Sequence, residues 1–270
     1  MAAESILASY LLDNINEWIN DIQQPEARLK ALKILASPVV IRERQIKPWL
    51  FVYLYRKAKL LKPVEIAVLE EGIINAAQQL PGFERNKRIV IASDISASMQ
   101  TPLQNAPYLQ RFDVGILLSM LLQDKCRRLQ AGFIGNTFKP VNFPKRNVLQ
   151  ELDNYRRLEG SVGYACYAPA LLAELTAKRK MVDKIFILTD QDWDDQNMAY
   201  KIADQWKAYK QVAPAAKLYW MNLSSSKGIA IRMDKLDLYV VEGWSDTLFD
   251  ILQVVQGNPL PIEAQLAAAS

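Results

Sequence analysis

The fold is decided by the stretch Arg88-Ile89-Val90-Ile91-Ala92-Ser93-Asp94-Ile95-Ser96-Ala97-Ser98-Met99. Residues 89–92 form a short apolar run followed by polar residues, which is typical of a buried strand in a parallel sheet. The residues after such a strand lie in a loop at the carboxyl edge of the sheet, where open α/β sheets bind their ligands. Asp94, Ser96 and Ser98 therefore offer one carboxylate and two hydroxyls at one place. Hard cations such as Mg²⁺ prefer oxygen ligands, with waters or a partner's carboxylate completing the shell.

A second stretch repeats this pattern further along the chain. Residues 184–188 read Lys-Ile-Phe-Ile-Leu and are followed by Thr189 and Asp190. Helical and strand-like segments alternate around the two stretches, which predicts an α/β protein with an open, mostly parallel, Rossmann-like sheet and helices on both faces. Helices are expected at 108–129, 147–158, 166–179, 196–212 and 246–256, and further strands at 130–135, 137–143, 182–188, 217–222 and 237–241.

The composition argues against several classes of protein. The chain of 270 residues contains no histidine, so it lacks the usual general base and the commonest zinc ligand, and we expect a non-catalytic protein. Two cysteines, Cys126 and Cys166, are too few for a disulfide framework and favour a reducing setting. The first ten residues show no signal-peptide pattern, and no apolar run approaches the ~20 residues needed to cross a bilayer. We therefore expect a cytoplasmic protein with no membrane segment.

The N-terminal third is predicted to be helical. Pro25, Pro48 and Pro63 each precede an apolar helical pattern and can occupy the first turn of a helix. The expected organisation is a helical domain at 1–84, a sheet domain at 85–257 and a flexible tail at 258–270. The first helix carries an apolar stripe, which must be buried either on this chain or on a partner chain in a larger assembly. The stripe consists of Leu7, Leu11, Ile15, Trp18 and Ile22.

Residues 28–62 are strongly basic, with Glu43 as the single acid. One interpretation is a solvated helix face; the other is an electrostatic surface for a phosphate backbone or an acidic partner. The candidate nucleic-acid-binding residues of this stretch are Arg42, Arg44, Lys47, Arg56 and Lys57.

The Asp-x-Ser-x-Ser pattern at 94–98 and the Thr189-Asp190 pair resemble the metal-ion-dependent adhesion site of von Willebrand factor A domains. Within that superfamily, the chain resembles the Ro autoantigen, or TROVE, family over roughly residues 24–256. The segments that carry this resemblance are 46–56, 80–82, 216–222 and 243–246.

The resemblance implies a von Willebrand factor A fold after a helical-repeat region. It also implies a Mg²⁺ or Mn²⁺ site formed by Asp94, Ser96, Ser98 and Asp190. Proteins of the Ro family hold small noncoding RNAs and misfolded RNA ends, so RNA is one implied partner. A protein partner could complete the metal site with an acidic residue.

The chain departs from the family pattern in two places. Residues 1–84 supply only about two helical hairpins, so one copy cannot close the ring of stacked repeats typical of the family. In the third ligand loop the family has Gly-Thr, whereas this chain has Gly163-Tyr164, and Ser161 could turn in instead. We therefore expect a metal-assisted binding module that resembles a truncated Ro protein. The alternatives are an RNA-binding protein that uses residues 28–62, or an adaptor subunit of a ring-shaped ATPase.

Overall fold

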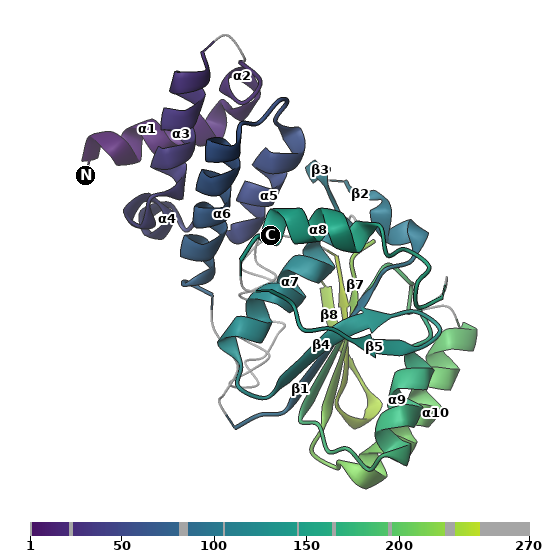
Figure 1. The fold of residues 1–270 in the computed structure, drawn as a ribbon. Coiled ribbons are helices and arrows are strands. Elements are labelled where there is room, and N and C mark those ends of the chain that lie inside the picture. The colour runs from purple at the N-terminus through teal and green to yellow at the C-terminus, as the bar shows by residue number, and fades with distance from the viewer. Residues whose placement is uncertain are drawn as a thin grey trace.

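A computed structural model describes residues 2–21, 24–80, 86–104, 106–144, 146–163, 166–193, 196–224 and 230–243. Within these residues the chain forms a group of helices followed by a seven-stranded sheet that is flanked by helices on both faces (Figure 1). The α/β fold predicted from the sequence is confirmed. The predicted boundary between the helical and sheet domains and the predicted tail at 258–270 lie outside the described residues. None of the helices described is both long enough and apolar enough to cross a membrane.

The helices before the sheet begin largely at prolines. Pro25, Pro38, Pro48 and Pro63 each occupy the first position of a helix, where the fixed φ of proline fits and its missing N–H is not needed. The helices predicted at Pro25, Pro48 and Pro63 are confirmed, whereas the short helix at Pro38 was not predicted. The bounds are α1 (Ala2–Asp13), α2 (Ile15–Trp18), α3 (Pro25–Ala36), α4 (Pro38–Arg44), α5 (Pro48–Lys57) and α6 (Pro63–Ala77).

The sheet has the strand order β5-β4-β1-β6-β7-β9-β8. Its five central strands are parallel, and β5 and β8 pair antiparallel at the two edges. The strands are β1 (Ile89–Asp94), β4 (Leu129–Ile134), β5 (Phe138–Pro140), β6 (Lys184–Thr189), β7 (Lys217–Asn222), β8 (Ala230–Asp234) and β9 (Leu238–Glu242).

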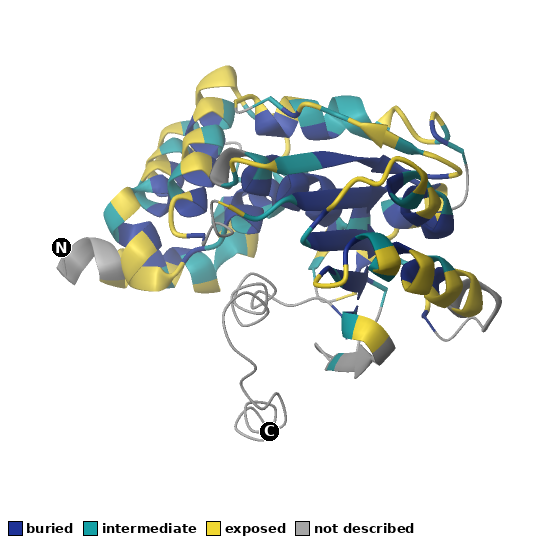
Figure 2. Ribbon diagram, turned by 90° about the horizontal axis from the view of Figure 1, so that it is seen from below, coloured by how far each residue is buried: buried dark blue, intermediate teal, exposed yellow. Residues whose placement is uncertain are grey.

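Alternate residues of the central strands point into two separate cores. In β1, Ile89 and Ile91 belong to the core shared with α7 (Arg111–Lys125), α8 (Val148–Arg156) and the N-terminal helices. Val90 and Ala92 belong to the core under α9 (Ala168–Ala177) and α10 (Gln196–Val212). This alternation follows from the two-residue period of a strand. Figure 2 shows the buried residues running through the sheet and along the inward faces of the helices.

The helical group and the sheet share one hydrophobic core. Phe51 and Leu69 of the helical group belong to the same buried cluster as Phe112 and Phe186 of the sheet domain. In Figure 1 the helices α1–α6 lie beside the sheet domain, next to α7 and α8. The N-terminal helices are therefore packed on the sheet domain and are not joined to it by the chain alone.

Several elements differ from the sequence predictions. The helix predicted from residue 108 begins at Arg111, because 106–110 form β3 (Ala106–Gln110), which pairs with β2 (Pro102–Leu103). Strand β8 was missed, since its pairing with β9 comes from the tertiary fold. The short 3₁₀ helix η1 (Ala97–Gln100) and the turn η2 (Lys235–Asp237), in which Leu236 and Asp237 have positive φ, were not predicted. The helix predicted at 246–256 lies outside the described residues.

Candidate functional site at the carboxyl edge of the sheet

Asp94 is the last residue of β1 and is fixed by two hydrogen bonds. Its Oδ1 accepts a bond from the backbone N–H of Ser96 at 2.8 Å. Its Oδ2 accepts a bond from the hydroxyl of Thr189 at 2.7 Å, across from the neighbouring strand β6. Asp94 is 1% exposed. The carboxylate is thus held in one orientation by both strands that meet at this edge.

A chain of hydrogen bonds continues from Asp94 to Asp190. The hydroxyls of Ser96 and Ser98 lie 3.2 Å apart, and Ser98 donates to Asp190 Oδ1 at 3.0 Å. Ser96 is buried, whereas Ser98 is exposed to solvent. The structure therefore brings together the four residues predicted as metal ligands, and Ser98 makes the group accessible from outside.

Arg111 is a member of this site that the sequence analysis missed. Its Nη1 lies 2.7 Å from Asp190 Oδ2, with the two side chains 18% and 7% exposed. Arg111 opens α7, and the pair joins residues far apart in the chain. The carboxylate of Asp190 is thus shared between a hydroxyl and a guanidinium.

Burial controls the electrostatics of the inner part of the site. Burial raises the pKa of Asp94, and the nearby charge of Asp190 adds to the rise. The hydrogen bonds from Ser96 and Thr189 act in the opposite direction but do not outweigh burial. Cys166, which the sequence analysis did not connect with this site, adjoins Asp94 and Thr189. Its complete burial, followed by the charge of Asp94, raises the pKa of its thiol well above the ordinary value. The thiol is therefore neutral and has little nucleophilic character.

The chemistry of the donor set fits a hard divalent cation. Asp94, Ser96, Ser98 and Asp190 supply only carboxylate and hydroxyl oxygens, which are the ligands that Mg²⁺ prefers. The described residues contain no cluster of three or more His, Cys, Asp or Glu side chains, so a cation here would depend on the serine hydroxyls.

The third ligand loop is described only in part. Tyr164 lies outside the described residues. Ser161 is exposed, beside Gly160 and Gly163, which both have positive φ. Within the part of the chain that the structure describes, no hydrogen bond connects Ser161 with the chain that runs from Asp94 to Asp190.

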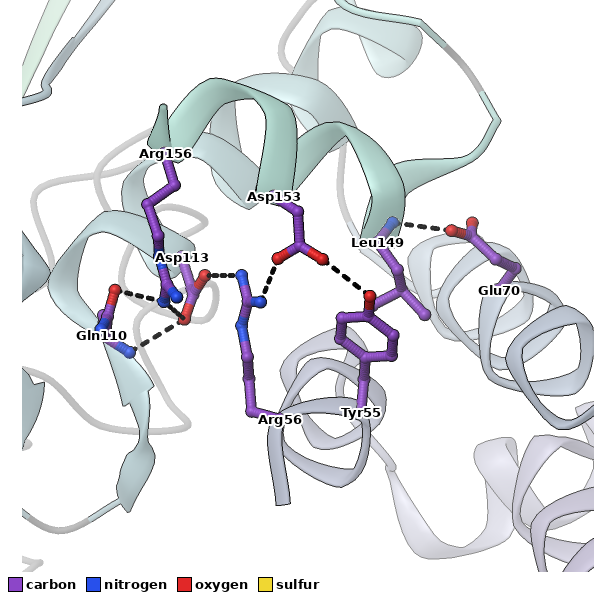
Figure 3. Close-up of polar contacts among 8 residues, drawn as sticks. All are labelled: Tyr55, Arg56, Glu70, Gln110, Asp113, Leu149, Asp153 and Arg156. Carbon is purple, nitrogen blue, oxygen red and sulfur yellow. Dashed lines mark hydrogen bonds and ion pairs between the residues drawn. The ribbon is translucent and has the colours of Figure 1, made fainter. Parts of the chain in front are cut away.

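Arg56, one of the predicted nucleic-acid-binding residues, is directed into the protein. Its Nη2 lies 2.7 Å from Asp113 of α7, and its Nη1 pairs with Asp153 of α8 (Figure 3). Tyr55 donates to the other oxygen of Asp153 at 2.7 Å. The prediction that Arg56 lies on a basic surface is corrected, because acids of the sheet domain bind its charge.

Two other basic residues of the stretch are also engaged internally. Lys57 is buried; it donates to Asn16 and, at 3.0 Å, to the hydroxyl of Tyr53, so its placement on the basic surface is corrected too. Arg28 forms a buried ion pair with Glu65 at 2.6 Å.

Arg42 and Arg44 are both exposed in the last turn of α4. Lys47 is half-buried at the start of α5. The exposed basic surface of this part of the chain is therefore smaller than its sequence indicates.

Comparison with known proteins shows which solved structure has a similar fold. No model of a protein family matches the sequence, and no curated protein matches it. Among solved structures, the Ro (RSR) protein of Deinococcus radiodurans is similar, with a TM-score of 0.65 and 18% sequence identity. The match covers 87% of this chain and 48% of the other, so the chain spans about half the length of that protein. The resemblance to Ro-type proteins is thus confirmed in the fold.

Proposed function

We propose that this chain is a non-catalytic binding module of the Ro type that engages a protein or ribonucleoprotein partner at the carboxyl edge of its sheet. The observation that carries the proposal is the hydrogen-bonded chain from Asp94 through Ser96 and Ser98 to Asp190. It runs from a buried carboxylate to an exposed hydroxyl, so a ligand can reach it from solvent. The similarity of fold to the Ro protein supports the same assignment.

The residues of this edge would hold Mg²⁺ or Mn²⁺ between the two serine hydroxyls and the two carboxylates. A bound cation supplies positive charge to which an acidic side chain of a partner can bind. The backbone N–H of Ser96 and the hydroxyl of Thr189 keep Asp94 in place for this task. Arg111 competes with the cation, because its guanidinium occupies one oxygen of Asp190.

Cation binding can be measured directly by titrating the protein with Mn²⁺ and following free Mn²⁺ by electron paramagnetic resonance. Wild-type protein should bind one Mn²⁺ that millimolar Mg²⁺ displaces. Ser98→Ala and Asp190→Asn should each weaken binding at least ~10-fold, the effect of losing about 1.4 kcal/mol. The matched control is Asp192→Asn, which removes an exposed carboxylate two residues from Asp190. Absence of binding at millimolar Mn²⁺, or equal loss in the control, would contradict the metal-assisted mechanism.

Arg111→Gln provides an independent test of this arrangement. If the guanidinium competes for Asp190, the variant should bind Mn²⁺ more tightly than the wild type. Weaker binding would mean that Arg111 orients Asp190 for the cation and does not compete with it.

A second candidate function is RNA binding by the exposed end of α4. Arg42 and Arg44 are exposed there, with Lys47 close by in sequence. Charge reversal at these three positions should weaken the binding of a single-stranded RNA. The slope of log Kd against log salt should also fall by ~0.7 for each phosphate that the variant no longer neutralises. Binding that does not respond to salt would favour a solvated face.

The cellular setting we propose is the cytoplasm. Neither Cys126, which is half-buried, nor Cys166, which is buried, forms a disulfide, and a protein with reduced thiols suits a reducing compartment.

A further inference from the structure

The amino edge of the sheet carries a row of basic residues. Arg127 and Arg128 precede β4, and Arg88 precedes β1. Lys184, the first residue of β6, is buried, and Lys217, the first residue of β7, is half-buried, so Arg88, Arg127 and Arg128 carry more of the accessible charge of this row. The strand register aligns these starts, since Ile89 pairs with both Leu129 and Lys184, and Lys184 pairs with Lys217. Neighbouring strands lie about 4.7–4.9 Å apart, so the row is about 14 Å long.

The loop between α9 and β6 adds further cations to this edge. Lys178, Arg179 and Lys180 follow α9 directly, and all three are exposed. The ammonium of Lys180 donates to the side chain of Gln130 in β4, which places the loop beside the strand that Arg127 and Arg128 precede. Arg127 and Arg128 are exposed as well. The loop and the strand starts thus form one surface.

Acidic side chains neutralise only part of this charge. Asp183 accepts bonds from the Arg88 backbone at 2.7 Å and from its guanidinium at 3.1 and 3.2 Å, which lowers the pKa of Asp183. Lys178 pairs with Glu174 at 2.6 Å. Among the described residues no ion pair joins Arg127, Arg128 or Arg179 to an acid, so these arginines give the edge its excess positive charge.

Arg179 occupies a backbone position that favours glycine. Its φ is +47°, in the left-handed region, just after α9. Its N–H bonds to Thr176 O at 3.0 Å and the N–H of Lys180 bonds to Leu175 O at 2.9 Å, which is the Schellman pattern. Glycine is the usual residue at this point because it has no Cβ to strain. The positively charged Arg179 therefore occupies a position at which glycine would make the protein more stable.

We infer that this amino-edge surface binds the phosphate backbone of a nucleic acid, independently of the carboxyl edge and of Arg42 and Arg44. Arginine guanidiniums bind phosphate in bidentate geometry, and a row of them suits a polymer with regularly spaced anions. The described residues of the surface include no exposed aromatic side chain for stacking on bases, so recognition is independent of sequence. Met181 is the exposed large apolar residue of the described part of this surface. One such side chain provides little apolar area for insertion into a membrane.

The two edges of the sheet therefore differ in charge. Asp94, Asp190 and the exposed Asp192 lie at or just beyond the carboxyl ends of the strands, whereas the cations lie at the amino ends. A polyanion is attracted more strongly to the amino edge than to the carboxyl edge, where Asp190 is paired with Arg111 and Asp192 is exposed. The two surfaces can thus hold different partners at the same time.

Fluorescence anisotropy with a labelled 20-nucleotide poly(U) RNA tests this inference on the full chain. With about four neutralised phosphates, log Kd should change with log salt by about 2.8. Arg127→Gln with Arg128→Gln should reduce this slope by about 1.4 and weaken binding at least ~10-fold at low salt. The matched control is Lys139→Gln with Lys207→Gln, which removes the same charge from exposed positions on β5 and α10.

Arg179→Gly separates binding from folding. This variant should weaken RNA binding while raising Tm by about 2 °C, because glycine relieves the left-handed strain. Lack of RNA binding at 50 mM salt would overturn the inference, as would a slope that the double arginine variant leaves unchanged. Binding to phosphatidylserine vesicles through the same arginines, without RNA binding, would overturn it in favour of a membrane surface. None of these outcomes depends on Mn²⁺, so the proposed function can fail or stand separately.

Discussion

Replacing Arg56 with methionine should destabilise the protein by about 3–5 kcal/mol, since this leaves the almost completely buried carboxylate of Asp113 without its ion-pair partner. Arg56 belongs to α5 of the helical group, and its guanidinium reaches Asp113 of α7 and Asp153 of α8 (Figure 3). The exposed fractions of the three side chains are 12%, 1% and 33%. Methionine preserves much of the volume of the side chain but removes its charge and its donors.

The predicted loss of stability in Arg56→Met comes mainly from Asp113. Without Arg56, its carboxylate keeps a hydrogen bond from the Gln110 N–H at 3.0 Å and a distant Arg156 at 3.8 Å. An almost completely buried charge left with so little compensation accounts for the predicted destabilisation. Asp153 is one-third exposed, so water can replace its partner, and it adds at most about 1 kcal/mol. Burial alone would lower the pKa of Arg56, but the charges and hydrogen bonds of the two acids outweigh it and raise the pKa.

Urea unfolding followed by tryptophan fluorescence measures this destabilisation. The chain has six tryptophans, including Trp49 in α5 and Trp220 in β7, so the signal covers both parts. The predicted change corresponds to roughly 6–20 °C in Tm. The matched control is Arg157→Met, an exposed arginine next to Arg156, which should change stability by no more than about 0.5 kcal/mol.

A double variant tests whether the unpaired charge of Asp113 causes the loss of stability. Combining Arg56→Met with Asp113→Asn removes the charge that the single variant leaves buried, so it should recover part of the stability. If Arg56→Met costs less than about 1 kcal/mol, or if the double variant is no more stable than the single one, the ion pair does not hold the helical group against the sheet as inferred.

Four further variants concern the same interface and the helices beside it. Both oxygens of Glu70 accept N–H bonds at the start of α8, from Val148 at 3.0 Å and Leu149 at 2.6 Å, yet burial raises the pKa of Glu70 above 4.5. The folded state then binds this proton more tightly than the unfolded state, so stability should fall as pH rises from 4.5 through the raised pKa. Glu70→Gln should remove this contribution, and a wild-type-minus-variant difference in urea midpoint that stays constant from about pH 4 to 7 would contradict it. Gly72→Ala should cost about 1–3 kcal/mol, because a Cβ there would lie 2.3 Å from the buried ring of Phe51. Gly115→Ala in α7 should stabilise by about 0.5–1 kcal/mol, since its nearest neighbour would be 3.6 Å away; equal thermal shifts in the two variants would refute this reasoning. Deleting residues 1–23 should lower the Tm of a monomer, because Ala8 and Leu11 of α1 are buried in the helical group. A variant that keeps its Tm but no longer forms an assembly seen by light scattering would instead place α1, with its exposed Ile6 and Tyr10, against a partner chain.

Local sequence determined the central strands and much of the candidate site. The apolar runs of β1 and β6 are buried on both faces, which is the environment their composition indicates. The carboxyl ends of parallel strands meet at one edge whatever their side chains are. Asp94, Ser96, Ser98 and Asp190 could therefore be placed together from the positions at which the two strands end.

The positions of the cations were decided by the tertiary structure. Arg42 and Arg56 lie in similar basic surroundings in the sequence, yet Arg42 is exposed, whereas Arg56 is half-buried and lies between two acids from helices far along the chain. Arg111 likewise meets Asp190 only because α7 packs against the carboxyl end of β6. The charge of a residue is a property of the sequence, but burying that charge requires a partner acid at hydrogen-bond distance, and long-range packing supplies the partner.

Strands β3 and β8 also depend on the tertiary structure and not on their local sequence. Residues 108–110 were predicted as the start of a helix but belong to β3, because β2 offers backbone partners. Strand β8 exists through its pairing with β9. A strand at an edge has few buried side chains to mark it in the sequence, so its neighbour's free N–H and C=O groups determine whether it forms.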